Sequence, residues 1–379
     1  MKKIAKKHLS TCLLNSLILC LFILVLLPAC NKLHDFLPDE NIKDPKFLPG
    51  QWSVSNALVS SNPAFKPRNL DPLLVNARGI AFTNSGSVWI AAQDKGVSTS
   101  YDNNGQRLLP AVSIPSPAGP AGGSPTGIVF NSSRTDFILS NGQAGTILFV
   151  GLDGIISGWN AQAGTSALLI KNNVATSSYT GLALASDGGA NFLYASNFKT
   201  RRIDVYDRTF TQVTNKKFID PLLPPDYSPF NIQALGGKLF VAYARVGPDG
   251  KTLDGNGNGI VNIFGTDGTL LKRLATQGPL NSPWGIALAP AGVLPSGAND
   301  VTILVANHGN GRINGYSVDG VFKGQFQDSR GEVFEIGGIW AISFAPATFT
   351  GDPNRPYITA GPMQSGAVAS GGFWQLFNL

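Results

Sequence analysis

A short segment that recurs about every 50 residues constrains the fold of this 379-residue chain more than any other feature. Each copy begins with a turn residue. A glycine follows in most copies, and a few small apolar residues come after it. The clearest copies are Ala77–Phe82, Pro125–Phe130, Tyr179–Leu184 and Pro283–Leu288, and degenerate copies stand at Pro229–Ile232 and Gly338–Ile342. A regular period of this length indicates a fold made of one repeated supersecondary unit.

Segments of strand character follow each copy. Second strands are predicted at Val88–Gln93, Phe137–Asn141, Phe192–Asn197, Leu239–Ala244, Ile303–Asn307 and Tyr357–Gly361. A third, alternating strand comes next, and in several copies a turn such as Asp267-Gly268 follows it. Because Asp-Gly between apolar strands is a strong hairpin signal, we interpret the repeat as a four-stranded antiparallel sheet.

Such a sheet cannot bury both faces alone, and stacking the copies in a ring supplies the missing partner surfaces. We therefore predict an all-β fold, a six-bladed β-propeller over residues 51–379. The glycines of the first strands fit this prediction, because innermost strands crowd around the axis. The last repeat, which ends at Gly372–Phe377, is one strand short, so we expect Trp52–Val59 to add that strand and close the ring. A two-sheet sandwich is the rival fold, and the long regular period argues against it.

The first 50 residues have the pattern of a targeting sequence and a tether. Four lysines stand among residues 2–7, an apolar run spans residues 13–27, and Leu-Pro-Ala precedes Cys30. This pattern predicts a lipoprotein signal peptide over residues 1–29, with Cys30 as the lipidated residue. Residues 30–50 are predicted to be a flexible tether. The alternatives are a plain signal peptide or an uncleaved anchor, which would be short for the roughly 20 residues that span a bilayer.

Cleavage before Cys30 would change both the charge and the cysteine count. The formal charge of +6 would fall to about +2 without the four lysines, which leaves no electrostatic footprint for nucleic acid. Cys12 and Cys20 would leave with the signal, which excludes a disulfide and a cysteine metal site in the remainder. We therefore predict no nucleic-acid partner.

One stretch of the chain has a specific resemblance. Residues 304–316 read Leu-Val-Ala-Asn-His-Gly-Asn-Gly-Arg-Ile-Asn-Gly-Tyr, with Trp284–Ala287 before them and Gly338–Ala341 after them. These segments resemble an uncharacterised conserved bacterial propeller family related to NHL-repeat proteins, some members of which carry a PEP-CTERM sorting tail. The resemblance covers nearly all of residues 52–379. It implies an exported propeller and brings no activity with it.

In propellers, the loops that enter the first strands and those that join second to third strands surround the mouth of the central channel. Aligning the repeats places the candidate ligand-binding residues there: Arg78, Asp94, Asn141, Asn197, Arg245, Trp284, Asn307, His308 and Trp340. Asn141, Asn197 and Asn307 fall at equivalent positions and form the clearest polar set. Asparagine also tolerates unusual turn dihedrals, which is the alternative reason for finding it there.

Catalytic or metal chemistry has little support in the sequence. His308 is the one histidine of the predicted propeller, G-x-S-x-G does not occur, and Glu332 and Glu335 share one predicted loop. We predict no catalytic residue, no cofactor and no metal site. The one set with oxygen ligands for Ca²⁺ is Asp94, Asn141, Asn197 and Asn307. Asp254–Gly259 begins like a calcium loop, but Gly265 stands where such a loop needs a glutamate.

Two functional hypotheses follow. The first is a binding or scaffold module without catalytic activity at the bacterial cell envelope, exported and lipid-anchored through Cys30, in the outer membrane where there is one. Its partner would be an envelope protein, a polysaccharide or a small ligand, with Trp284, Trp340 and Tyr179 available for stacking. Packing between blades is the alternative role of these rings. The second hypothesis is a calcium-dependent hydrolase or lactonase-like propeller that uses the oxygen set above.

Overall fold

The computed structural model describes residues 47–54, 57–294, 301–350, 353–362 and 371–378. These residues belong to one compact unit, Asp44–Leu379. Strands dominate it, and the helical elements in the described ranges are three 3-10 turns, Pro63–Phe65, Gln93–Lys95 and Ala161–Ala163, and the α-helix α3, Ala347–Thr350. No helix in these ranges has the length and apolar character that crossing a bilayer requires.

Four separate sheets each contain four antiparallel strands that pair in sequence order. The first consists of β4 (Ala77–Phe82), β5 (Val88–Ala92), β6 (Val97–Tyr101) and β7 (Val112–Ser113). The second consists of β10 (Pro125–Phe130), β11 (Ile147–Gly151), β12 (Ile155–Trp159) and β13 (Leu168–Asn172). The third consists of β14 (Tyr179–Asp187), β15 (Ala190–Asn197), β16 (Arg202–Asp207) and β17 (Gln212–Val213). The fourth consists of β18 (Tyr227–Leu235), β19 (Lys238–Arg245), β20 (Gly259–Phe264) and β21 (Leu270–Thr276).

The remaining strands form one ten-stranded sheet and one small hairpin. The large sheet contains β22 (Pro283–Ala289), β23 (Thr302–Asn307), β24 (Ile313–Ser317), β25 (Phe322–Gln327), β1 (Phe47–Val54), β28 (Gly372–Asn378), β2 (Val59–Ser60), β3 (Asn69–Leu70), β26 (Ile339–Phe344) and β27 (Pro356–Ala360). The hairpin pairs β8 (Pro115–Ser116) with β9 (Gly119–Gly122).

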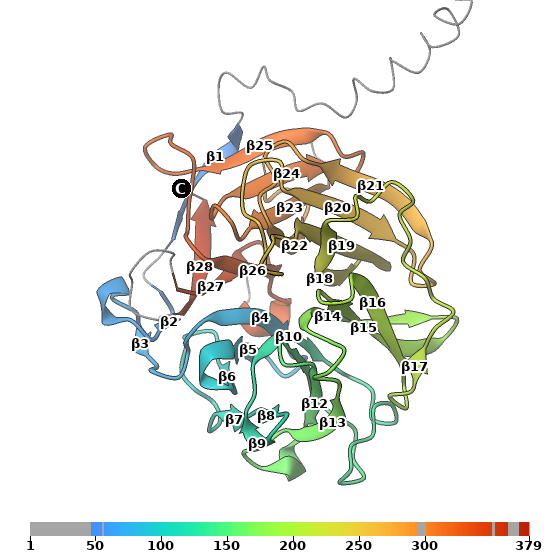
Figure 1. The fold of residues 1–379 in the computed structure, drawn as a ribbon. Coiled ribbons are helices and arrows are strands. Elements are labelled where there is room, and N and C mark those ends of the chain that lie inside the picture. The colour runs from blue at the N-terminus through green and yellow to red at the C-terminus, as the bar shows by residue number, and fades with distance from the viewer. Residues whose placement is uncertain (1–46, 55–56, 295–300, 351–352, 363–370, 379) are drawn as a thin grey trace, which may run out of the picture. The chain divides into compact units, whose positions relative to one another are not determined.

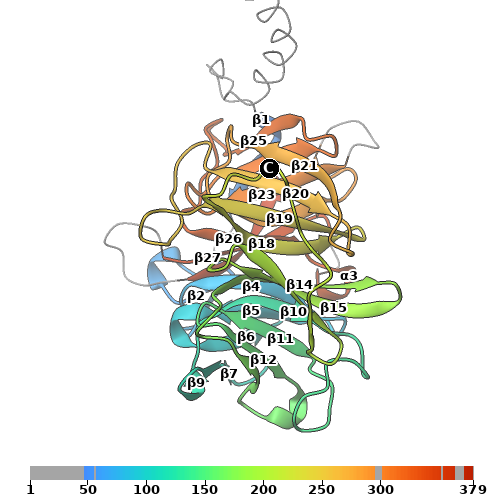
Figure 2. The same cartoon turned by 45° about the vertical axis from the view of Figure 1, so that its right-hand side comes forward.

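The fold is an all-β propeller, but the prediction of six blades is wrong. The structure has four separate four-stranded blades, and the strands of the remaining repeats merge into the ten-stranded sheet. The merger is made by β1, which pairs with β25 in parallel and with β28 in antiparallel orientation. The N-terminal strand therefore adds to β28, the last strand of the last repeat, and also joins that repeat to β25. Figures 1 and 2 show blue β1 beside orange β25.

The first strands of the repeats lie around one centre. Contacts run from β4 to β10, β14, β18, β22 and β26 in turn, and from β26 back to β4; Figure 1 shows these strands innermost, with the later strands farther out. The close approach explains the glycines. A Cβ on Gly127 would stand 2.5 Å from the backbone N of Leu182 on β14, and one on Gly285 would stand 2.5 Å from the carbonyl O of Trp340 on β26.

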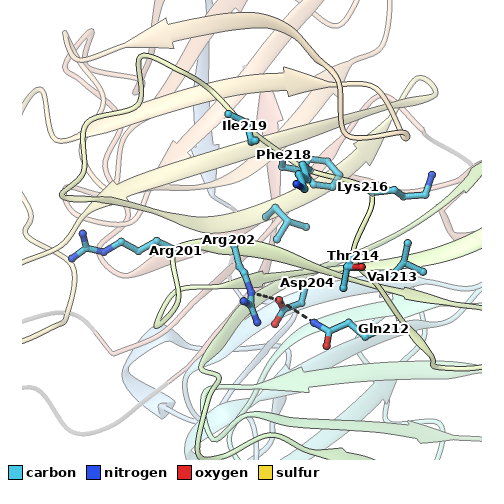
Figure 3. Close-up of a pocket in the computed structure, with 11 residues that line it drawn as sticks. Arg201, Arg202, Asp204, Gln212, Val213, Thr214, Lys216, Phe218 and Ile219 are labelled. Atoms are coloured by element: carbon cyan, nitrogen blue, oxygen red, sulfur yellow. Dashed lines mark hydrogen bonds and ion pairs between the residues drawn. The ribbon is translucent and has the colours of Figure 1, made fainter.

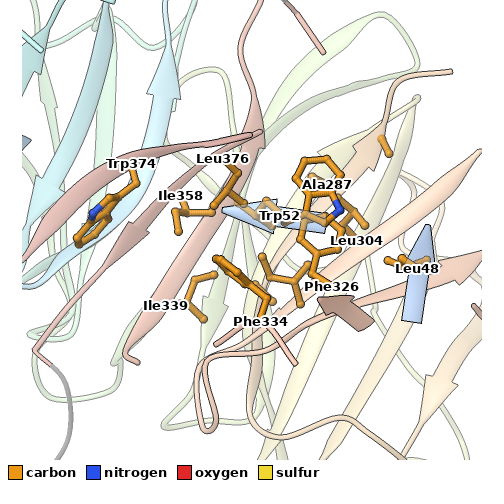
Figure 4. Close-up of a cluster of buried hydrophobic side chains, with 14 of the residues drawn as sticks. Leu48, Trp52, Ala287, Leu304, Phe326, Phe334, Ile339, Ile358, Trp374 and Leu376 are labelled. Atoms are coloured by element: carbon orange, nitrogen blue, oxygen red, sulfur yellow. The ribbon is translucent and has the colours of Figure 1, made fainter. Parts of the chain in front are cut away.

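The junction made by β1 has its own apolar core (Figure 4). Trp52 of β1 stacks on Phe326 of β25 with ring centroids 4.3 Å apart and an interplanar angle of 8°. Leu304 and Leu376 are fully buried in the same cluster. This packing fixes the N-terminal strand to the strands that end the chain, because both sides of Trp52 are covered by apolar neighbours.

One predicted second strand is wrong. The segment Phe137–Asn141 is not a strand; the second strand of that blade is β11, Ile147–Gly151. Phe137 has a φ of 60°, which is left-handed backbone that a strand does not contain. In the pairing of β10 with β11, Gly151 stands opposite Pro125. The position that corresponds to Asn197 and Asn307 is therefore taken by Gly151 and not by Asn141.

Candidate functional site

Every first strand has a bulge at the same place. The register with the second strand shifts between Ala77 and Ile80, Pro125 and Gly127, Tyr179 and Gly181, Pro229 and Asn231, Pro283 and Gly285, and Ile339 and Ile342. A bulge re-aims the side chain of the extra residue and is common next to functional sites. The side chains at these positions, which we term the bulge ring, are Arg78, Thr126, Thr180, Phe230, Trp284 and Trp340.

Hydrogen bonds between first strands fix the bulge ring. The hydroxyl of Thr126 donates to the carbonyl of Tyr179 at 2.8 Å. The indole N–H of Trp284 donates to the carbonyl of Thr180 at 3.0 Å, which carries the ring of Trp284 from β22 across to β14. The amide of Asn231 donates to the carbonyl of Trp284 at 2.7 Å. The ring is therefore held by polar contacts as well as by packing.

Aromatic side chains fill the middle of the bulge ring. Trp340 lies with its ring centroid 5.8 Å from those of both Trp284 and Phe230. Phe198 packs on Phe230 at 5.6 Å. All four side chains are buried, between 4% and 9% exposed. They form an apolar wall around the one charged member of the ring, Arg78.

Arg78 is a buried cation that forms no ion pair with the described residues. Its side chain is 7% exposed, its guanidinium carbon lies 3.7 Å from the ring centroid of Trp340, and its Nε has no hydrogen-bond partner in the same part of the chain. Burial lowers the pKa of Arg78 from 12.5 to about 9, an effect that the carboxylate of Asp94 opposes. Arg78 remains positively charged at neutral pH, and its hydration is not replaced by an anion of the chain.

His308 covers the same tryptophan. It follows β23, and its ring stacks on Trp340 with centroids 3.6 Å apart and an interplanar angle of 14°. Its Nδ1 lies 3.2 Å from the carbonyl O of Ile339, so Nδ1 carries the proton and donates. Burial, and then the nearby Arg78 cation, lower the pKa of His308 to about 4. The imidazole is therefore neutral at physiological pH and adds no second positive charge.

The sequence analysis missed Asn76. Its Oδ1 accepts the indole N–H of Trp340 at 2.9 Å, and its Nδ2 donates to Asp94 at 3.0 Å. Asn76 has a φ of 52°, a conformation that asparagine adopts more readily than most residues. An asparagine directly before the segment Ala77-Arg78-Gly79 was the available signal. Asp94, itself exposed, is linked to Trp340 of the bulge ring through this amide.

The other predicted site residues have local partners. The amide of Asn141 pairs with Asn160, buried Asn197 bonds Asp204, and Asn307 donates to the carbonyl of Pro279 at 2.7 Å. Arg245 forms an exposed ion pair with Asp226 at 2.7 Å. The structure thus brings together Arg78, Trp284, His308 and Trp340. Among the described residues, no group of three or more His, Cys, Asp or Glu side chains could hold a metal ion.

A cavity of about 310 Å³ lies along the later halves of the first strands. It is lined by residues of β4, β10, β14, β18 and β26, from Ile80, Phe82 and Leu184 to Gln233 and Ser343. Ile80 also packs against the aromatic side chains of the bulge ring. The cavity lining contains no charged side chain, and Arg78 is not part of it.

No family model matches the chain. It is 32% identical to uncharacterized protein R648 of Acanthamoeba polyphaga mimivirus over 305 residues, 77% of this chain and 73% of the relative. It is 30% identical to uncharacterized protein L690 of the same virus over 329 residues, 83% of this chain and 85% of the relative.

Solved structures with a similar fold include a streptogramin B lyase and a virginiamycin B lyase from Staphylococcus aureus crystallised with quinupristin. The first is 14% identical, covers 86% of this chain and 98% of its own, and has a TM-score of 0.49. The second is 13% identical, covers 81% of each chain, and has a TM-score of 0.47.

The sequence relatives correct two predictions. They are proteins of a virus, so the assignment to a bacterial propeller family is wrong. For the same reason the predicted location at a bacterial cell envelope is wrong. Cys30, the predicted lipidation site, lies outside the described residues, as do the predicted signal peptide and most of the tether.

Proposed function

We propose that this chain, which belongs to the family of the mimivirus proteins R648 and L690, is a propeller-type binding module that holds a small organic anion at Arg78. The observation that carries the proposal is the buried guanidinium with an unpaired Nε. A buried charge is costly unless it is paired and hydrogen-bonded. An anion from solution would supply the partner that the chain does not.

The surroundings of Arg78 favour an anion with a flat or apolar body. The guanidinium lies on the ring of Trp340, and Trp284 and Phe230 pack against that ring. The planar fork of arginine matches carboxylate and phosphate groups in bidentate geometry. Neutral His308 would leave one ring nitrogen, Nε2, as a further acceptor for a hydroxyl or amide of the ligand. We therefore expect a carboxylate or phosphate on an aromatic or aliphatic body.

Thermal unfolding of the full-length chain tests the proposal. A ligand that binds the folded state alone raises the melting temperature by mass action. Benzoate and phenyl phosphate should raise it, and benzyl alcohol, which has a similar body and no charge, should not. Acetate and inorganic phosphate carry the anionic group without the aromatic ring, so their effect on the melting temperature measures the contribution of the charge alone.

A matched pair of variants assigns the effect to Arg78. The substitution Arg78→Met removes the charge and keeps most of the side-chain length, and the response to benzoate should disappear. Arg208, whose side chain is 63% exposed, provides the control substitution Arg208→Met, which should keep the response. A response of equal size in Arg78→Met, or to benzyl alcohol, would contradict the proposal.

A further inference from the structure

A second hollow lies far out on the third blade, away from the bulge ring. Its volume is about 330 Å³, and it lies between β16 and β17 on one side and residues 216–219 on the other (Figure 3). Arg202, Asp204 and Gln212 stand on the first side, and Phe218 and Ile219 stand on the second. No residue of the bulge ring contributes to it.

The hollow occupies the place where a longer fourth strand would run. β17 has two residues and pairs only with Val205 and Tyr206 of β16. In the neighbouring blade, the fourth strand β21 pairs with β20 along its length from Ile260 to Phe264. The first half of β16, Arg202–Asp204, therefore has no strand partner on its outer side. An unpaired strand edge is a template for a strand from another chain.

Positive charge surrounds this open edge. Arg201, Arg202, Lys216 and Lys217 line the hollow, and Asp204 is the one acidic side chain of the lining. Lys216 is paired with Asp187 and Arg202 with Asp204, so the charges without an ion pair among the described residues are those of Arg201 and Lys217. Asp204 is buried and already bonds Arg202, Asn197 and Tyr179. Lys217 is exposed, and its ammonium has no ion pair or hydrogen bond among the described residues. The edge thus presents cationic side chains that an acidic partner would neutralise.

Apolar side chains complete the lining. Phe218 is fixed in place by edge-to-face contacts with Tyr194 at 5.8 Å and with Phe264 at 5.2 Å. Ile219 beside it is 59% exposed, so its side chain is open to contact with a partner. The hollow therefore offers an apolar wall opposite the strand edge, with positive charge at both ends.

We propose that this hollow binds an extended, acidic segment of a partner protein, which adds to the free edge of β16 as a strand. Main-chain hydrogen bonds to the edge would supply affinity, and alternate side chains would meet different surroundings. Apolar side chains of the segment would contact Phe218 and Ile219. Acidic side chains would contact Lys217 and the neighbouring arginines. The inference is independent of the anion proposed for Arg78.

Binding is measured by fluorescence anisotropy with the full-length chain. The probe is a labelled peptide of about ten residues that alternates glutamate and valine, a length typical of strands. A peptide that alternates lysine and valine tests charge, and a version of the acidic peptide N-methylated at every second residue tests strand pairing. We expect binding of the acidic peptide, weakening as salt rises, and no binding of the other two.

Variants of exposed residues locate the binding site. Lys217→Glu and Ile219→Asp should each weaken binding by about tenfold or more, which is about 1.4 kcal/mol. Both positions are exposed, so folding should persist, and melting curves check this. Lys238→Glu, an exposed lysine in the β18–β19 hairpin, is the charge control, and Arg78→Met should also bind normally.

Three results would overturn the inference. The first is that the acidic peptide does not bind. The lysines would then serve to prevent other strands from pairing with the edge. The second is equal affinity of Lys217→Glu and the unchanged chain, or equal affinity for the N-methylated peptide. The third is tighter binding of an oligothymidylate than of the acidic peptide, which would make the surface a nucleic-acid site.

Discussion

The guanidinium carbon of Arg78 lies 3.7 Å from the ring centroid of Trp340, and this contact replaces the ion pair that a buried arginine usually has. A cation on an aromatic face gains about 0.5–2 kcal/mol. Loss of hydration costs several kcal/mol for a buried ion. The contact therefore offsets only part of the cost, and the chain maintains a destabilising group at the centre of its first strands.

Arg78→Met should accordingly stabilise the chain in the absence of anions. Methionine fills similar space, packs on Trp340 and needs no hydration. We expect the free energy of unfolding to rise by about 1 kcal/mol or more, as when buried ionic groups are replaced by apolar ones of similar volume. Denaturant unfolding measures it, with Arg208→Met, expected within about 0.5 kcal/mol of the unchanged chain, as the control. A loss of stability in Arg78→Met would show that the contact with Trp340 outweighs the desolvation.

His308 should make stability depend on pH below neutrality. Its pKa in the folded chain is about 4, below its ordinary 6.5, because burial and Arg78 disfavour the charged form. Between these values the unfolded chain binds more protons than the folded chain, so stability falls as the pH is lowered from about 6.5 to about 4. Above about pH 6.5 the contribution of His308 to the free energy of unfolding is constant.

The variant His308→Phe isolates this term, because phenylalanine keeps a stacked ring and cannot be protonated. Urea unfolding at about pH 4.5 and about pH 7.5 gives the comparison. Carboxylates titrate in both chains and cancel in the difference. The unchanged chain should lose more stability on acidification than His308→Phe. Equal losses would mean that the imidazole is free to take up a proton in the folded chain.

The hydrogen bond from Trp340 to Asn76 should be measurable as a coupling energy. Asn76→Gly removes the acceptor and suits the φ of 52°, and Trp340→Phe removes the donor. If the bond is made, the double variant is less destabilised than the sum of the single variants, by about 1 kcal/mol. Thermal or denaturant unfolding of the unchanged chain, the two single variants and the double variant gives the coupling energy. Strict additivity would mean that the two side chains do not interact.

The positions of the first strands could be predicted from the sequence because each close approach between neighbouring first strands requires a glycine at a regular interval. Gly79, Gly127, Gly181 and Gly285 recur since a neighbouring first strand leaves no room for a Cβ. The number of blades could not be predicted in the same way. It depends on the parallel pairing of β1 with β25, such as Phe47 with Gln325, which merges two repeats and leaves no periodic trace.

The candidate site was predictable in part for a similar reason. Arg78 and Trp284 stand at one position of the repeat, so alignment of the copies placed them together. The alignment put Ile339 at that position of the last copy, and the bulge between Ile339 and Ile342 puts Trp340 there instead. Asn141 was misplaced because the left-handed backbone at Phe137 interrupts the expected strand, and a phenylalanine gives no warning of a positive φ. The bulges that aim these side chains at the centre are visible only in the register of the paired strands.

Because the first strands crowd together, alanine substitutions of two glycines should differ sharply in their effect on stability. Gly127→Ala would place a Cβ 2.5 Å from the backbone N of Leu182, where neither strand can easily shift. We expect a cost of about 1–3 kcal/mol in unfolding free energy. Gly119 has no atom within 4 Å of its Cβ position, so Gly119→Ala should cost little. Equal stabilities of the two variants in denaturant would contradict the close approach of β10 and β14.

The junction made by β1 provides the last prediction. Trp52 is 2% exposed and stacked on Phe326, so Trp52→Ala should cost about 3–5 kcal/mol. The indole N–H of Trp52 is buried and has no hydrogen-bond partner among the residues that the structure describes. Trp52→Phe removes this unsatisfied donor and keeps a stacked ring, so it should cost much less than Trp52→Ala.

Denaturant unfolding distinguishes these two effects, and Val54→Ala serves as the control because Val54, on the same strand, is 39% exposed. If β1 joins β25 to β28 as the pairing shows, Trp52→Ala should also expose the free edges of both strands to solvent. Hydrogen exchange should then accelerate in β25 and β28 together, while β11 and β12 in a separate blade stay protected. Faster exchange in only one of the two strands would mean that the N-terminal strand does not unite them.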